Sequence, residues 1–62
     1  MKNNYNVNLV NNQGCNFDNG EFTDLEQAKK WASDRGENYI AYFKKNYDPE
    51  LNCSEEEFEI NY

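Results

Sequence analysis

Alternation of polar and apolar side chains marks the first element of the chain. In residues 4–10 the apolar positions recur at every second residue, with asparagines between them; they are Tyr5, Val7 and Leu9. A repeat of two places these side chains on one face of a half-buried β-strand. Residues 11–14 are typical of a turn. A short return strand over residues 15–17 can follow it and would add a fourth strand to the sheet.

A helix over residues 24–35 is the most clearly marked element. Thr23 is followed three residues later by Glu26, a pattern in which each side chain bonds a free backbone N–H of the first turn. The apolar residues of this segment recur at helical spacing along one stripe. They are Leu25, Ala28, Trp31 and Ala32. Gly36 supplies a residue that adopts a left-handed conformation easily and so ends the helix.

The next predicted strand, residues 38–45, is apolar on both faces at its centre. One face holds Tyr39, Ala41 and Phe43, and the other holds Ile40 and Tyr42. The pattern leaves open which set points into the core. One helix covers only one face of a sheet, so either choice leaves aromatic surface on the other face. An apolar patch of this kind usually marks a site of interaction.

A second alternating segment ends the chain. Residues 48–55 are predicted to form a polar loop or a single turn. In the segment after them, apolar and polar residues alternate: Glu57, Phe58, Glu59, Ile60, Asn61 and Tyr62. A helix starting at Ser54 competes, because Ser54 and Glu57 also fit a capping pattern. The spacing fits a period of two better than one of 3.6, so we predict a strand.

These elements predict a single α+β domain over residues 1–62, with the order β-α-β-β. The sheet has three strands, or four if residues 15–17 pair, and is mainly antiparallel, with one helix on one face. A right-handed crossover would set strands 4–10 and 38–45 parallel. The C-terminal strand would then run antiparallel between them or at an edge. A core this small supplies only about 3–5 kcal/mol of stability.

The charge of the chain is negative and unevenly placed. The net charge is −6, from twelve acidic and six basic residues, and residues 48–62 contain no Lys or Arg. This field opposes direct binding to a nucleic-acid backbone and favours a basic protein partner. The same charge also has a simpler meaning, since it keeps small proteins apart in solution.

Catalytic and metal-binding chemistry is poorly represented. The chain has no histidine, which removes the commonest general base and the usual zinc ligand. We therefore predict no enzymatic activity, no cofactor and no metal site. No apolar run approaches the roughly 20 residues of a membrane span, and the first residues do not resemble a signal peptide. We expect a cytoplasmic protein in which Cys15 and Cys53 are free thiols; in an exported protein they would instead form a bridge.

The pattern and the charge together indicate a small acidic protein-binding module, of inhibitor or adaptor type and suited to a phage or mobile element. It would act through the uncovered aromatic sheet face and the acidic C-terminal edge. The candidate partner-binding residues are Tyr39, Tyr42, Tyr47, Glu55, Glu56, Glu57 and Glu59. A first alternative is a structural module that only forms a homodimer. A second is a nucleic-acid mimic, in which Glu57 and Glu59, about 6.7 Å apart on one strand face, imitate phosphates.

Overall fold

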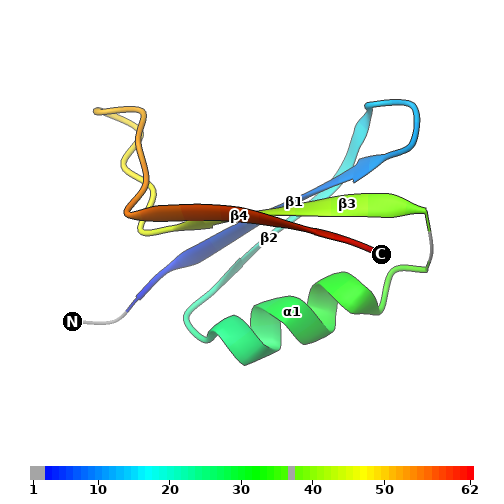
Figure 1. Ribbon diagram of the computed structural model, residues 1–62. Helices are drawn as coiled ribbons and strands as arrows, with labels where there is room; N and C mark the ends of the chain where they lie inside the picture. Colours follow the sequence, from blue (N-terminus) through cyan, green and yellow to red (C-terminus); the bar gives the residue numbers. More distant parts are fainter. Residues whose placement is uncertain (1–2, 37) are drawn as a thin grey trace.

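The computed structural model describes residues 3–36 and 38–62 and contains one antiparallel sheet and one helix. The elements are β1 (Tyr5–Asn11), β2 (Asn16–Phe22), α1 (Leu25–Ser33), β3 (Tyr39–Lys45) and β4 (Glu56–Asn61). The four strands lie in the order β2-β1-β3-β4, and α1 lies below one face of the sheet (Figure 1). The predicted α+β class is confirmed. Met1 and Lys2 lie outside the described residues. They belong to the first residues, which the sequence analysis compared with a signal peptide.

The fourth strand that the sequence left open is present, and it is a full strand of seven residues, β2. The order of elements is therefore β-β-α-β-β and not the predicted β-α-β-β. The helix therefore connects β2 to β3, and these two strands run in the same direction on either side of β1. As a result, β1 and β3 are antiparallel, not parallel, with Asn8 paired to Tyr42. The polar sequence Asp18-Asn19-Gly20 is typical of a turn, and that is why the pattern predicted only a short return strand over residues 15–17.

The helix is shorter than predicted at both ends. Asp24, not Thr23, is the N-cap: its backbone is extended, and its side chain accepts a hydrogen bond from the backbone N–H of Glu26 at 3.2 Å. At the other end the N–H of Asp34 donates to the carbonyl of Trp31 at 3.3 Å. This tighter last turn ends α1 at Ser33.

The core lies between α1 and the sheet. The fully buried side chains come from the helix and from the two central strands: Val7, Leu9, Ala28, Ala32, Ala41 and Phe43. Because Val7 pairs with Phe43, and Leu9 with Ala41, these residues share one face of the sheet. The register thus settles which side of β3 is buried, and it is the side that carries Phe43.

The two cysteines lie in different loops. Cys15 belongs to the β1–β2 turn and Cys53 to the β3–β4 loop, which stand at opposite ends of the sheet (Figure 1). Both are exposed free thiols, so the alternative of a Cys15–Cys53 bridge is excluded in this fold. Within residues 3–36 and 38–62, no helix is long and apolar enough to cross a membrane.

Candidate functional site

The face of the sheet opposite α1, called the open face below, is covered by no other element of the described chain. Figure 1 shows that the β1–β2 turn and the β3–β4 loop rise on this side, one at each end of the sheet. The loop stands upright because Asp48 and Cys53 exchange backbone hydrogen bonds of 2.8 and 3.3 Å. Neither connection extends over the middle, so the open face is bounded at its ends and accessible at its centre.

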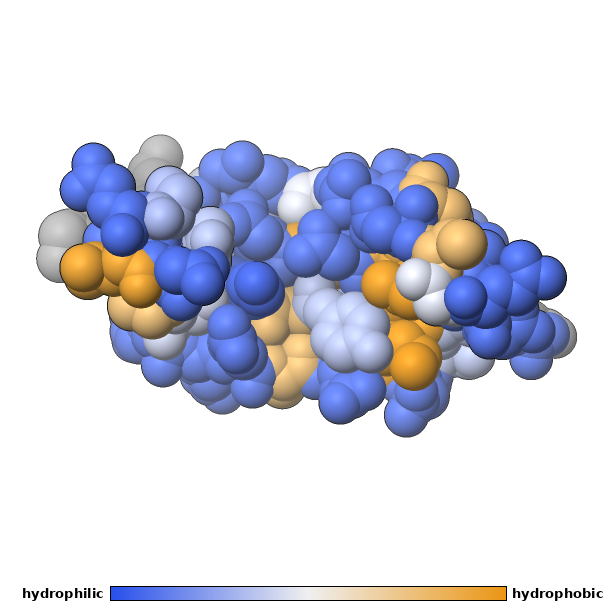
Figure 2. Space-filling view, turned by 90° about the horizontal axis from the view of Figure 1, so that it is seen from above, coloured by the Kyte–Doolittle hydropathy of each residue, from blue (hydrophilic) through white to orange (hydrophobic). Residues whose placement is uncertain are grey.

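Strand register assigns the side chains of this face to rows that cross the sheet. The middle row is Asn19, Asn8, Tyr42 and Glu59. The row on the loop side is Glu21, Asn6, Lys44 and Glu57. On the turn side, Val10 lies beside Ile40, which lies beside Asn61. Figure 2 looks onto this face and shows hydrophilic residues over most of it, with hydrophobic surface in small separate groups. The open face is therefore less apolar than the sequence predicts.

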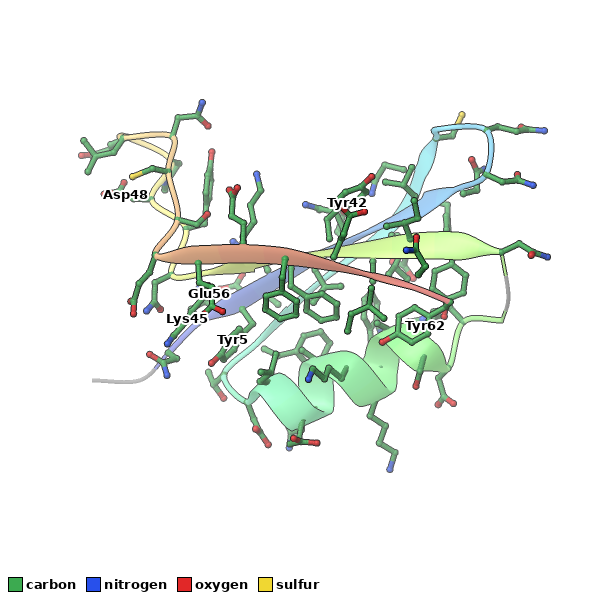
Figure 3. The ribbon with its side chains drawn as sticks, in the orientation of Figure 1. Tyr5, Tyr42, Lys45, Asp48, Glu56 and Tyr62 are labelled. Atoms are coloured by element: carbon green, nitrogen blue, oxygen red, sulfur yellow. The ribbon has the colours of Figure 1, made fainter. Side chains whose placement is uncertain are left out.

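Tyr42 is the central aromatic of the open face. Its side chain points away from the helix, whereas Tyr5 and Tyr62 lie on the helix side (Figure 3). It is 37% exposed, and the half-buried Val10 and Ile40 lie in the adjacent row. This placement agrees with one of the two orientations that the sequence left open for β3.

Tyr39 has the opposite placement. It is only 4% exposed, and its hydroxyl donates to the carbonyl of Ala32 and accepts from the backbone N–H of Arg35 at 3.3 Å. Its ring lies 5.3 Å from the ring of Tyr62. Tyr39 therefore belongs to the core, and the prediction that it contacts a partner is withdrawn.

Tyr47 lies at the loop end of the open face. The ammonium group of Lys44 sits 4.8 Å from its ring centre, and its hydroxyl donates to Asn52 at 2.9 Å. It borders a shallow depression of about 460 Å³ that is lined mainly by polar groups: Asn6, Asn8, Asn19, Glu21, Lys44 and Tyr47. The asparagines were not among the predicted site residues. For Asn6 and Asn8 the alternation with Val7 and Leu9 was the available signal, because it assigns them to the face opposite the core. Asn19 lies in β2 and gave no such signal.

The four predicted glutamates do not form one acidic row. Glu57 pairs with Lys44 and Glu59 with Tyr42, which places both on the open face. Glu56 pairs with Lys45 on the helix side. Successive residues of a strand point to opposite faces, and this geometry divides the acidic cluster.

Glu55 precedes β4 and is held by its neighbours. It accepts a hydrogen bond from the side-chain amide of Asn46 at 2.7 Å and forms an ion pair with Lys45 at 3.5 Å. The hydrogen bond from Asn46, followed by the charge of Lys45, lowers the pKa of the Glu55 carboxyl below its usual range. This carboxylate closes the base of the β3–β4 loop.

Glu57 and Glu59 are exposed, and neither forms an ion pair within the described residues, although Lys44 lies opposite Glu57 on the neighbouring strand. In the described part of the chain the ion pairs are Arg35 with Asp18 and Lys45 with Glu55. Glu57 accepts one hydrogen bond, from the hydroxyl of Ser54 at 3.2 Å. The edge of the open face along β4 therefore carries two carboxylates that no basic side chain of residues 3–36 and 38–62 neutralises by an ion pair.

Comparison of the chain with protein-family models, with curated proteins and with solved structures found no match. Among the described residues, no group of three or more metal-binding side chains is placed to hold one ion. The arrangement that remains is a surface: a half-exposed tyrosine among amides, beside a strand edge with free carboxylates.

Proposed function

We propose that this chain is a protein-binding module of inhibitor or adaptor type. Its binding surface consists of the open face around Tyr42 and the acidic edge formed by β4. The observation that carries the proposal is the position of Tyr42, 37% exposed at the centre of a sheet face that no other element of the described chain covers. Tyrosine is among the residues most enriched as anchors in protein interfaces.

The surroundings of Tyr42 support this role. Val10 and Ile40 extend the apolar contact on one side, while Asn8 and Asn19 supply hydrogen-bonding groups in its own row. An apolar centre with a polar rim is the usual anatomy of an interface between proteins that also exist apart. An obligate homodimer needs a larger and more apolar surface, so the predominance of amides disfavours the structural-dimer alternative.

Charge favours a basic partner. The net charge is −6, and Glu57 and Glu59 are on the same side of the sheet as Tyr42. Complementary charge speeds encounter and aligns the partner. The division of the acidic residues between two faces disfavours the nucleic-acid mimic, because only part of the cluster can face one groove. We also propose a cytoplasmic site of action, which suits two free thiols.

Affinity capture from a lysate of the source cell tests the proposal when it compares matched variants. Tyr42→Lys alters the open face, and Glu26→Gln makes the same unit change of charge on the exposed side of the helix. We expect a protein that the wild type and Glu26→Gln retain and Tyr42→Lys loses. If all three chains retain the same proteins, the open face is not the binding surface. Light scattering of the isolated chain should report a monomer.

A further inference from the structure

β4 is an edge strand whose outward backbone groups are free. It pairs with β3 and with no other strand of the described chain. Tyr62, just beyond it, donates its N–H to the carbonyl of Tyr39 at 2.9 Å. In an antiparallel pair, residues alternate between those bonded to the partner strand and those directed away from it. Because Tyr62 is bonded to β3, so are Ile60 and Phe58, which precede it by two and four residues. The backbone groups of Glu57 and Glu59, which lie between them, therefore point away from the sheet.

The side chains along this edge alternate in chemistry. Glu57 and Glu59 lie on the open face, while Phe58 and Ile60 lie on the helix side, where both are half-buried and pack at the margin of the core. The helix contacts β1 and β2 most closely, so it leaves the apolar residues of the edge partly exposed. A strand added beside β4 would meet carboxylates on one face and apolar groups on the other.

Charge decides what such a strand can be. A second copy of β4 would bring glutamate against glutamate across the new pair, and like charges that face each other in a sheet are destabilising. The other edge, β2, carries Asp18 and Glu21 and has no Lys or Arg. Neither edge of this chain complements β4, so the complementary strand belongs to a different protein.

We propose that β4 binds an extended basic segment of a partner protein as a fifth strand of the sheet. Lysine or arginine at every second position of that segment faces Glu57 and Glu59, and the apolar residues between them contact Phe58 and Ile60. The inference rests on the proposed function and names the kind of partner and its mode of binding. In this mode, main-chain hydrogen bonds supply affinity and the alternating side chains supply specificity.

Two synthetic peptides test the register. The first is acetyl-Lys-Val-Lys-Val-Lys-Val-Lys-amide, and the second, acetyl-Lys-Lys-Val-Val-Lys-Lys-Val-amide, has the same composition without the alternation. Several cross-strand contacts are lost in the second, so it should bind at least about tenfold more weakly in a fluorescence titration. Equal binding of both peptides would reduce the interaction to net charge and overturn the proposal, as would failure of the first to bind.

Amide hydrogen exchange distinguishes strand addition from charge attraction, because charge attraction alone does not protect backbone amides from exchange. In the free protein the amides of Glu57 and Glu59 should exchange quickly, because they point outward, while those of Phe58 and Ile60 are protected by β3. With the alternating peptide bound, the amides of Glu57 and Glu59 should become protected as well. Peptide binding without this new protection would contradict strand addition.

A charge exchange separates this inference from the proposed function. The double variant Glu57→Lys and Glu59→Lys should lose the lysine peptide and gain affinity for acetyl-Glu-Val-Glu-Val-Glu-Val-Glu-amide. Tyr42→Lys leaves the edge strand unchanged. In this variant the lysine peptide should still protect the amides of Glu57 and Glu59, even if the variant no longer binds the natural partner. If the edge variants behave as the wild type towards both peptides, strand addition is wrong and binding through Tyr42 remains to be judged by its own test.

Discussion

The ring of Phe58 stacks on the ring of Phe43, with the centroids 4.8 Å apart and the planes 5° from parallel. Phe43 is fully buried in the central strand β3, and Phe58 belongs to the edge strand β4. Because α1 packs mainly on β1 and β2, this contact is a main attachment of the edge strand to the core. This aromatic pair therefore helps to hold the proposed binding edge, together with Ile60 and Tyr62, which also pack against the core.

Replacing Phe58 by alanine should destabilise the domain. The variant loses the stacking and much of the apolar burial of a half-buried ring, so the free energy of unfolding should fall by about 2–3 kcal/mol. Urea titration measures this loss. Leu51→Ala is the matched control, since Leu51 is 72% exposed, and it should change the free energy of unfolding by less than about 0.5 kcal/mol. Equal effects of the two substitutions would show that the stacked pair contributes nothing.

Gly20→Ala should disturb the packing between β2 and the helix. A Cβ atom at this position would lie 2.7 Å from Cε2 of Phe22 and 3.1 Å from Cη2 of Trp31. Both rings must shift to admit it, at a cost of about 1–3 kcal/mol, and the fluorescence of Trp31 should change. Gly14→Ala is the control: nothing lies within 4 Å, but its φ is +81°. It should cost about 1 kcal/mol from backbone strain and leave the tryptophan emission unaltered.

Lysine substitutions in β3 distinguish its two faces. Tyr39→Lys places a charge among buried rings and removes the bonds to Ala32 and Arg35, so the loss should exceed the roughly 3–5 kcal/mol that a domain of this size has. Tyr42→Lys places the same group on the open face, where the change should be within about 1 kcal/mol. Circular dichroism and amide chemical-shift dispersion measure the folded fraction. If the Tyr42 variant unfolds and the Tyr39 variant stays folded, then Tyr42 is the buried residue and Tyr39 lies on the open face, contrary to the structure.

The carboxyl of Glu55 should titrate below the usual range, and Asn46 should be the main cause. A folded-state pKa below the unfolded one means that the contribution of this carboxylate to stability is present above the unfolded pKa. It is lost as the pH falls through the lowered folded value. Asn46→Gly removes the amide that bonds Glu55 and still permits the positive φ of 53° at this position. The pKa of Glu55 should then rise, as followed by NMR of the side-chain carbonyl against pH.

Lys45→Met serves as the comparison for the Glu55 titration. It removes the charge of Lys45 and its hydrogen bond to the carboxylate, both of which lower this pKa, so the pKa of Glu55 should rise in this variant as well. An unchanged pKa of Glu55 in the Lys45 variant would show that Lys45 contributes nothing to the lowering.

Periodicity and capping, which are properties of neighbouring residues, were enough to predict β1, β3, β4 and the helix. The alternation of Tyr5, Val7 and Leu9 with asparagines predicted a half-buried strand, and the C-terminal alternation was correctly preferred over a helix. The N-cap was predicted one residue early, because Thr23 and Asp24 are both good caps. Only the extended backbone of Asp24 in the fold distinguishes them.

The chain by itself thus determined the class of the domain, its one helix, its negative charge and the two candidate faces of β3. Tertiary structure alone decided that β2 continues through the polar residues 18–20, because pairing with β1 holds them extended, with Asn19 beside Asn8. It also decided that Tyr42 is exposed and Tyr39 buried. The physical reason is that these outcomes depend on pairing between residues far apart in sequence, such as Leu9 with Ala41, which no local pattern specifies.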